Sequence, residues 1–240
     1  MERYQIYNAS IMEPEFAAKY PEIQSYVGIN MDNPGTTMRF STTILGFHAA
    51  IYTIGKTYYI DPYTADLNTY LFYAKENLYS DIERLGCQFT EGLQQNVEYN
   101  RIDNSLTQRN SNDGLLRTFR FALGSTQEYS NFHINLAGQQ AATDAVKRAT
   151  VLAAMNVTMT RVNGLFERDL SVSLNLIDNT SIIFLEEDDG LDNSNTNNIL
   201  LTQTQTTIDT NIGTANYDVG HMFSTGGGGV ASLGLSLIHI

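Results

Sequence analysis

The sequence has few of the features that would assign it to a class of protein at once. It contains one cysteine in 240 residues, which excludes a disulfide framework within the chain. Basic residues are scarce: 14 Lys and Arg stand against 26 Asp and Glu, giving a net charge of −12. Nucleic acid and anionic membrane surfaces would repel such a chain, so neither is expected as a partner.

Long apolar runs are also missing. No stretch approaches the roughly 20 apolar residues that span a bilayer. The first ten residues, MERYQIYNAS, have charge and polarity where the apolar core of a signal peptide would lie. Apolar residues nevertheless make up 42% of the chain and charged residues 17%, which is typical of globular material. A chain of this length is expected to form one large domain or two small ones.

The first hundred residues are predicted to form strands joined by turns. The stretch TMRFSTTI places Met38, Phe40, Thr42 and Ile44 on one face, the period-two pattern of a half-buried strand. FHAAIYTI and TYYIDPY follow, bounded by Gly, Pro or Asp, and they predict an antiparallel meander that ends near LNTYLFYAKENLY. Before it, residues 14–28 predict a short helical turn that Pro21 stops and that resumes briefly before Gly28.

Residues 91–115 differ in composition from both flanking segments. They are dominated by Asn, Gln, Ser and Asp and have few large apolar side chains. Such a segment buries too little surface to offset its ordering entropy, so it is expected to be an exposed linker. Arg101, Arg109 and Arg117 lie in or beside it, which would suit an activating cleavage. A linker that is never cut is the alternative.

The second half alternates strand and helix patterns. RTFRFALGS, SVSLNLI, SIIFL and YDVGHMFS are predicted strands. Between them, residues 143–170 predict a long amphipathic helix capped by Thr143 or Asp144, and ILLTQTQTTIDTNIG predicts a second, weaker one. The apolar positions of the long helix recur at steps of three or four residues: Val146, Leu152, Met155, Met159, Val162 and Phe166. This order indicates an α/β domain with a mixed sheet.

Spacing alone offers three candidate sites. The glycines at 226–229 are not followed by the lysine of a phosphate loop, which favours a flexible turn or a binding loop. The acidic loop Glu186–Asp192 offers the oxygen ligands that calcium prefers, but it lacks the glycine of an EF-hand loop, so a solvated loop is favoured. The four histidines at 48, 133, 221 and 239 form no HExxH pair, and no nucleophile elbow is present. Spacing therefore identifies no catalytic machinery.

Several stretches together resemble a known family. They are EFAAKYPEIQSYVG, GFHAAIYTIGKTYYIDPY, RTFRFALGSTQEYSNF, MTRVNGLFERDLSVSLNLI, NIGTANYDVGHMFS and GGGGVASLG. From about Pro14 to Gly234 the chain is similar to the propeptide and the front half of the catalytic domain of secreted, reprolysin-like (metzincin) zinc metallopeptidases of Bacteroidetes type.

The resemblance implies an α+β or α/β chain. An antiparallel, β-rich propeptide domain at 1–90 would precede the polar linker at 91–115. Residues 116–234 would form the upper subdomain of a metzincin catalytic domain, a mixed sheet with two helices. Residues 235–240, LSLIHI, do not continue the family pattern and look like foreign read-through.

The resemblance also implies where a substrate would bind. The last strand of the upper subdomain would be left open at the sheet edge so that a peptide can add to it. By resemblance, this edge strand comprises Gly220, His221, Met222, Phe223 and Ser224. The loop that follows it along the cleft would include Gly228, Gly229, Val230 and Ala231.

In the family, the catalytic zinc is held by three histidines of HExxHxxGxxH, whose glutamate is the general base. That motif is absent from these 240 residues, so the chain is expected to be an inactive piece, without catalytic or metal-ligating residues of its own, of a secreted bacterial enzyme that cleaves protein substrates. Calcium stays open as a second ion. Cys87 would be a temporary zinc ligand in the zymogen, with an incidental thiol as the alternative.

Two other functions remain open. A non-catalytic, secreted binding or adhesion module could use the same exposed edge strand. The first half could alternatively act on its own as an inhibitory propeptide.

Overall fold

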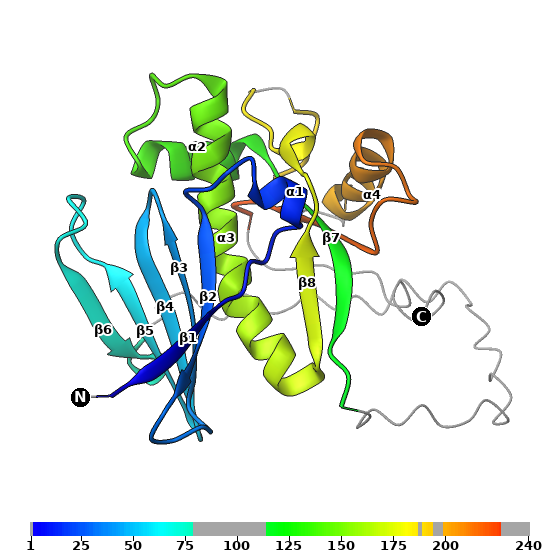
Figure 1. Ribbon diagram of the computed structural model, residues 1–240. Helices are drawn as coiled ribbons and strands as arrows, with labels where there is room; N and C mark the ends of the chain where they lie inside the picture. Colours follow the sequence, from blue (N-terminus) through cyan, green and yellow to red (C-terminus); the bar gives the residue numbers. More distant parts are fainter. Residues whose placement is uncertain (1, 79–113, 187–188, 194–198, 227–240) are drawn as a thin grey trace, which may run out of the picture.

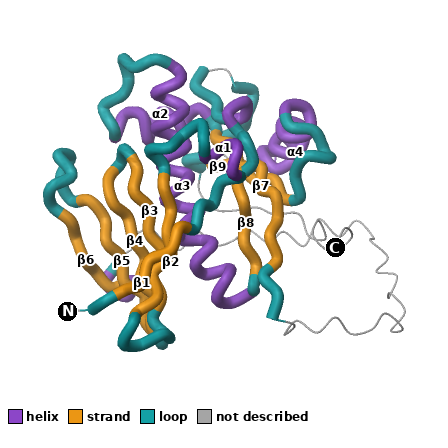
Figure 2. The backbone as a smooth tube through the Cα atoms, in the orientation of Figure 1, coloured by secondary structure: helices purple, strands orange, loops and turns teal. Residues whose placement is uncertain are grey.

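A computed structural model describes residues 2–78, 114–186, 189–193 and 199–226. These residues form four layers (Figures 1 and 2): a six-stranded sheet, helix α3 (Asp144–Leu170), a three-stranded sheet and helix α4 (Ile199–Asn211). Helix α3 lies between the two sheets. None of the helices in the described ranges is both long and apolar enough to cross a membrane.

The six-stranded sheet is the antiparallel meander predicted for the first half. Consecutive strands pair along its whole width. Its strands are β1 (Tyr4–Asn8), β2 (Gln24–Asn30), β3 (Thr37–Thr43), β4 (Gly46–Thr53), β5 (Lys56–Pro62) and β6 (Tyr70–Ala74), followed by the 3₁₀ turn η1 (Lys75–Asn77).

Two expectations for this half are wrong. The helix begins as predicted, as α1 (Pro14–Ala17), but it does not resume before Gly28, because that segment is strand β2. The apolar face of β3 is also not the buried one. Arg39 and Ser41 are buried against α3, whereas Met38 and Phe40 lie on the opposite face of the sheet.

The three-stranded sheet has the order β8–β7–β9 and consists of β7 (Arg117–Ser125), β8 (Val172–Leu176) and β9 (Val219–Phe223). Both pairings are parallel, so in the described residues it is not the mixed sheet that was expected. Each crossover contains helices, which is the connection that parallel neighbours require. The predicted strand SIIFL is instead the 3₁₀ turn η3 (Thr180–Ile182) with one bridge from Ile183 to Ser125.

The helices also differ in number from the expectation. Helix α2 (Gln127–Leu136) adds to the two that were predicted. Helix α3 has Thr143 as its N-cap residue and buries Leu152, Met155 and Met159 in the core, while Val146 stays 42% exposed. It ends at Ser171, whose left-handed backbone (φ 54°) turns the chain into β8.

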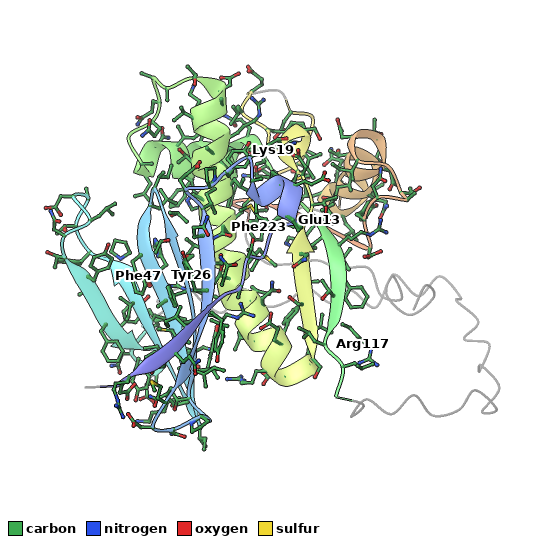
Figure 3. The ribbon with its side chains drawn as sticks, viewed as in Figure 1. Glu13, Lys19, Tyr26, Phe47, Arg117 and Phe223 are labelled. Atoms are coloured by element: carbon green, nitrogen blue, oxygen red, sulfur yellow. The ribbon has the colours of Figure 1, made fainter. Side chains whose placement is uncertain are left out.

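The main core joins the two halves of the chain. Ile11, Met12 and Phe16 are buried with side chains of β7, α3 and β8. Backbone bonds run from Glu13 N to Leu176 O (2.9 Å) and from Leu176 N to Ile11 O (2.6 Å), so the segment before α1 lies along the outer edge of β8. Glu13 and Lys19 mark this crossing in Figure 3. The boundary at 91–115 stays a prediction, because residues 79–113 lie outside the described ranges.

The contact between the six-stranded sheet and α3 is mainly polar. The hydroxyl of Ser25 lies 3.1 Å from the Asn156 Oδ1 atom and 2.9 Å from the Thr160 hydroxyl, all buried. The guanidinium of Arg39 bonds to the carboxylate of Glu167. These hydrogen bonds offset part of the penalty of burying the polar groups, although Arg39 Nε, Ser41 Oγ and Asn156 Nδ2 have no hydrogen-bond partner among the described residues.

Candidate substrate-binding edge

The candidate edge strand is β9, at one side of the three-stranded sheet. It pairs with β7 in parallel register, from Phe121 opposite Val219 to Ser125 opposite Phe223. In the described part of the chain, no strand pairs with the other side of β9. Ser224, the last residue assigned to the edge, follows the strand rather than belonging to it.

An ion pair fixes the start of β9. The carboxylate of Asp218 accepts a hydrogen bond from the Arg120 backbone N–H (2.7 Å) and another from its guanidinium (2.8 Å). The bond to the Arg120 side chain holds the pKa of Asp218 below its usual value. Both side chains are more than a third exposed (43% and 35%). The ion pair therefore orients the strand more than it stabilises the fold.

The inner face of β9 packs closely against its neighbours. Met222 is buried beside Gly124, where an added Cβ would lie 2.7 Å from the Met222 Cε atom. At Gly220 an added Cβ would lie 2.8 Å from the Cδ1 atom of Ile208 in α4. The two glycines let a methionine and a helix approach the sheet, and this holds the edge strand flat against α4.

The other face of β9 belongs to an aromatic cluster. His221 lies with its ring 5.4 Å from that of Phe223, and Phe223 lies 5.1 Å from Tyr129 of α2. Tyr129 contacts His133 at 4.5 Å. Burial lowers the pKa of His133 and raises that of Tyr129, so both side chains are neutral at pH 7.

Side chains from three segments meet where β7 and β9 end. Thr126, the N-cap of α2, accepts a bond from Tyr129 N (3.4 Å), and Asp189 accepts one from Gln127 N (2.7 Å). Asn193 donates to the Thr225 hydroxyl (2.8 Å) and accepts from Thr225 N (2.9 Å). The chain leaving β9 is therefore tied to the acidic loop and to the start of α2. Parallel sheets commonly bind ligands at this end.

One residue of this corner, Thr126, has a local sequence signal. Thr126 precedes a run with acidic and apolar residues at helical spacing, which is a helix start. Asp189 was placed in a solvated loop or a calcium site, but its carboxylate caps α2, where the helix dipole favours negative charge. Asn193 had no signal at all, because its partners are distant in sequence.

The described residues contain no group of three or more His, Cys, Asp or Glu that could hold a metal ion. They thus offer no ligand set for zinc, and calcium has no support in the described part of the acidic loop. His48 contacts Asp61 (2.6 Å) instead of a metal. Cys87, His239 and the cleft-loop residues Gly228, Gly229, Val230 and Ala231 lie outside the described residues.

A pocket of about 790 Å³ lies elsewhere, against the six-stranded sheet. Its lining comes from β4, β5, η1 and the end of α3, and includes Tyr52, Lys56, Lys75 and Arg168. No residue of β9 lines it, so it is separate from the candidate edge.

Comparison with known proteins gives one match. Residues 152–238 match the model of a family described as metallo-peptidase family M12B, reprolysin-like. The match begins within α3 and includes β8, α4 and β9, so this part of the chain is similar to a reprolysin-like metallopeptidase. It covers less than half of the chain. No curated protein and no solved structure matches.

Proposed function

We propose that the chain is part of the precursor of a secreted, zinc-dependent metalloendopeptidase. The observation that carries this proposal is the match of residues 152–238 to reprolysin-like metallopeptidases. The fold is compatible with it, since the matched segment contributes β8 and β9, which flank β7 in the parallel sheet, and β9 lies at the edge of that sheet in the described residues. Residues 1–90 would be the propeptide, and an activating protease would cut within the linker at 91–115.

Strand β9 would hold the peptide substrate. Its free side has backbone N–H and C=O groups available for strand addition, the mode by which an extended peptide gains affinity without sequence preference. His221 is exposed on this strand, while Met222 anchors it from behind. Gly220–Ser224 would bind the substrate backbone, and the loop through Gly228–Ala231 would line the cleft.

Zinc would be supplied by ligands that are not among these 240 residues, because the sequence has no HExxH pattern. When bound in such enzymes, zinc activates the attacking water and polarises the carbonyl. No step of hydrolysis is therefore assigned to a residue described above. Cys87 would serve as a thiolate ligand that blocks the metal until the propeptide is removed.

The test is to read the source gene on both sides of the coding segment and to express the complete product. We expect a HExxHxxGxxH motif downstream, peptidase activity in the processed protein, and loss of that activity when the motif glutamate is changed to glutamine. The 240-residue chain, as the matched control, should contain no stoichiometric zinc by elemental analysis.

Two results would contradict the proposal. One is a reading frame that closes without the motif, which would leave β9 as the edge of a non-catalytic binding module. The other is one tightly held zinc per 240-residue chain, since the proposed zinc ligands are not among these residues.

A further inference from the structure

The polar face of the six-stranded sheet packs against α3, and its mainly apolar face points away from α3. This is the reverse of ordinary two-layer packing. Cross-strand partners project to the same side, so the pairing registers define each face. On the side away from α3, the registers align uncharged and mostly apolar residues across the strands. They are Tyr26, Phe40, Ala49, Ile60 and Phe72 in one row and Ile6, Gly28, Met38, Ile51, Tyr58 and Ala74 in the next. We call this side the outer face.

The rings of the outer face contact one another. Tyr26 stacks on Phe40 at 4.9 Å, and Phe40 lies 5.4 Å from Phe47. Tyr58 stacks on Phe72 at 5.3 Å. Figure 3 labels Tyr26 and Phe47 on this sheet. Phe72 is nevertheless 62% exposed, so the rings cover one another only in part.

The opposite face is the polar one, and it is already covered. Arg39, Ser41 and Ser25 are buried there against α3. In the described part of the chain, α3 is the helix with the most extensive contact to this sheet. A contiguous apolar face of this kind is often an interaction surface.

We propose that the outer face binds the same face of a second copy of this chain, so that two sheets form a sandwich. Charge selects this face for contact between copies: the chain carries −12, so copies repel one another through most of their other surfaces. The apolar rows of the outer face carry no charge, and Lys56, which pairs with Glu76, lies at their margin. Two such faces can meet without opposing like charges.

The size of the face also suits a dimer. Six strands spaced about 4.8 Å apart and about six residues long span on the order of 500 Å². Face-to-face packing would then bury roughly 1,000 Å² in total, which is near the lower limit for a specific interface. The dimer is therefore expected to dissociate on dilution. A twofold axis would place the same rows against each other, as isologous interfaces require. This inference is independent of the proposed peptidase function.

The test compares neighbouring residues that point to opposite faces. Phe72 lies on the outer face and Leu71 on the other, and both are exposed at β6 (62% and 46%). Sedimentation equilibrium of the 240-residue chain over a concentration series should give a mass approaching twice 26.7 kDa. Phe72→Asp should weaken association at least tenfold, whereas Leu71→Asp should leave it unchanged.

A second matched pair of substitutions tests the other edge of the sheet. It also keeps the proposal testable if a variant of the first pair does not fold. Ile6 and Tyr7 of β1 are both 45% exposed and point to opposite faces. Ile6→Asp should weaken the dimer and Tyr7→Asp should not, with circular dichroism confirming the fold of each variant. A wild-type chain that stays monomeric at all concentrations would overturn the proposal. So would a dimer that survives both outer-face substitutions, because it must form elsewhere.

Discussion

His133 shows how a single side chain can make stability depend on pH. Its ring is packed against Tyr129 and Phe132, and burial lowers its pKa from the usual 6.5. Between the folded and the unfolded pKa the unfolded chain binds more protons, so lower pH favours unfolding. Stability should be complete above about pH 6.5 and should fall as the pH drops through that value.

Urea titrations between pH 7.5 and pH 5.5 would measure the free energy of unfolding. Its dependence on pH should be flatter in His133→Gln than in the wild type. The comparison isolates His133, because the remaining titrating groups are shared by both proteins. An identical pH slope in the two proteins would mean that His133 has the same pKa in both states.

Whether a residue of the candidate site could be predicted from the sequence depends on how near in the chain its contacts lie. The edge-strand residues Gly220–Phe223 could be placed on a strand from their pattern, and the structure confirms that strand. The contacts of Asn193 with Thr225 and of Asp189 with Gln127 could not be predicted, because these partners lie more than 30 residues away in the chain. No local pattern encodes such a contact.

At the scale of elements, the packing of α4 on β9 depends on the missing side chain of Gly220. The Cδ1 atom of Ile208 occupies the space that a Cβ would need, and Ile208 is only 1% exposed. Gly220→Ala should therefore lower the free energy of unfolding by about 1–3 kcal/mol, the usual cost of overpacking.

A double-mutant cycle provides the control. Ile208→Val removes the obstructing Cδ1 atom, so Gly220→Ala should cost clearly less in that background than in the wild type. Chemical denaturation of the four proteins gives the coupling energy. Equal costs in both backgrounds would show that the helix and the strand do not meet at this point.

Elements were predicted well where their periodicity was long or regular. The meander, α3, β7 and β8 follow patterns in which one face of each element is apolar. The short stretch SIIFL failed, because an apolar run of five residues fits a buried turn as well as a strand. The end of residues 14–28 is predicted as a helical turn but forms part of β2.

At the scale of the whole molecule, Gly164 decides how closely the six-stranded sheet approaches α3. A Cβ there would lie 2.6 Å from the Tyr52 ring and 2.8 Å from the Arg39 Cγ atom. The Tyr52 hydroxyl also donates to the Arg161 carbonyl (2.8 Å). Gly164→Ala should cost at least about 1 kcal/mol net, because the clash outweighs the roughly 1 kcal/mol gain in helix propensity.

Hydrogen exchange would locate the effect. Amides of β3 and β4 should lose more protection than those of β7 and β8, since the substitution separates the sheet from the helix. Gly35→Ala is the matched control, because Gly35 is exposed and its added Cβ would meet only ordinary contacts. If Gly164→Ala lowers stability no more than Gly35→Ala does, then the six-stranded sheet does not approach α3 closely at Gly164.

The sequence by itself determined the elements with regular periodicity and the acidic, globular character of the chain, because periodicity and charge are local or additive properties. Tertiary structure decided which face of each element is buried. The alternation of Met38 and Phe40 with Arg39 and Ser41 predicts two different faces. The polar face is the buried one because Arg39 bonds to Glu167 of α3, and Ser25, on the same face, bonds to Asn156 of α3. A buried polar face requires hydrogen-bond partners about 130 residues away in the chain, and their positions exist only once the chain has folded.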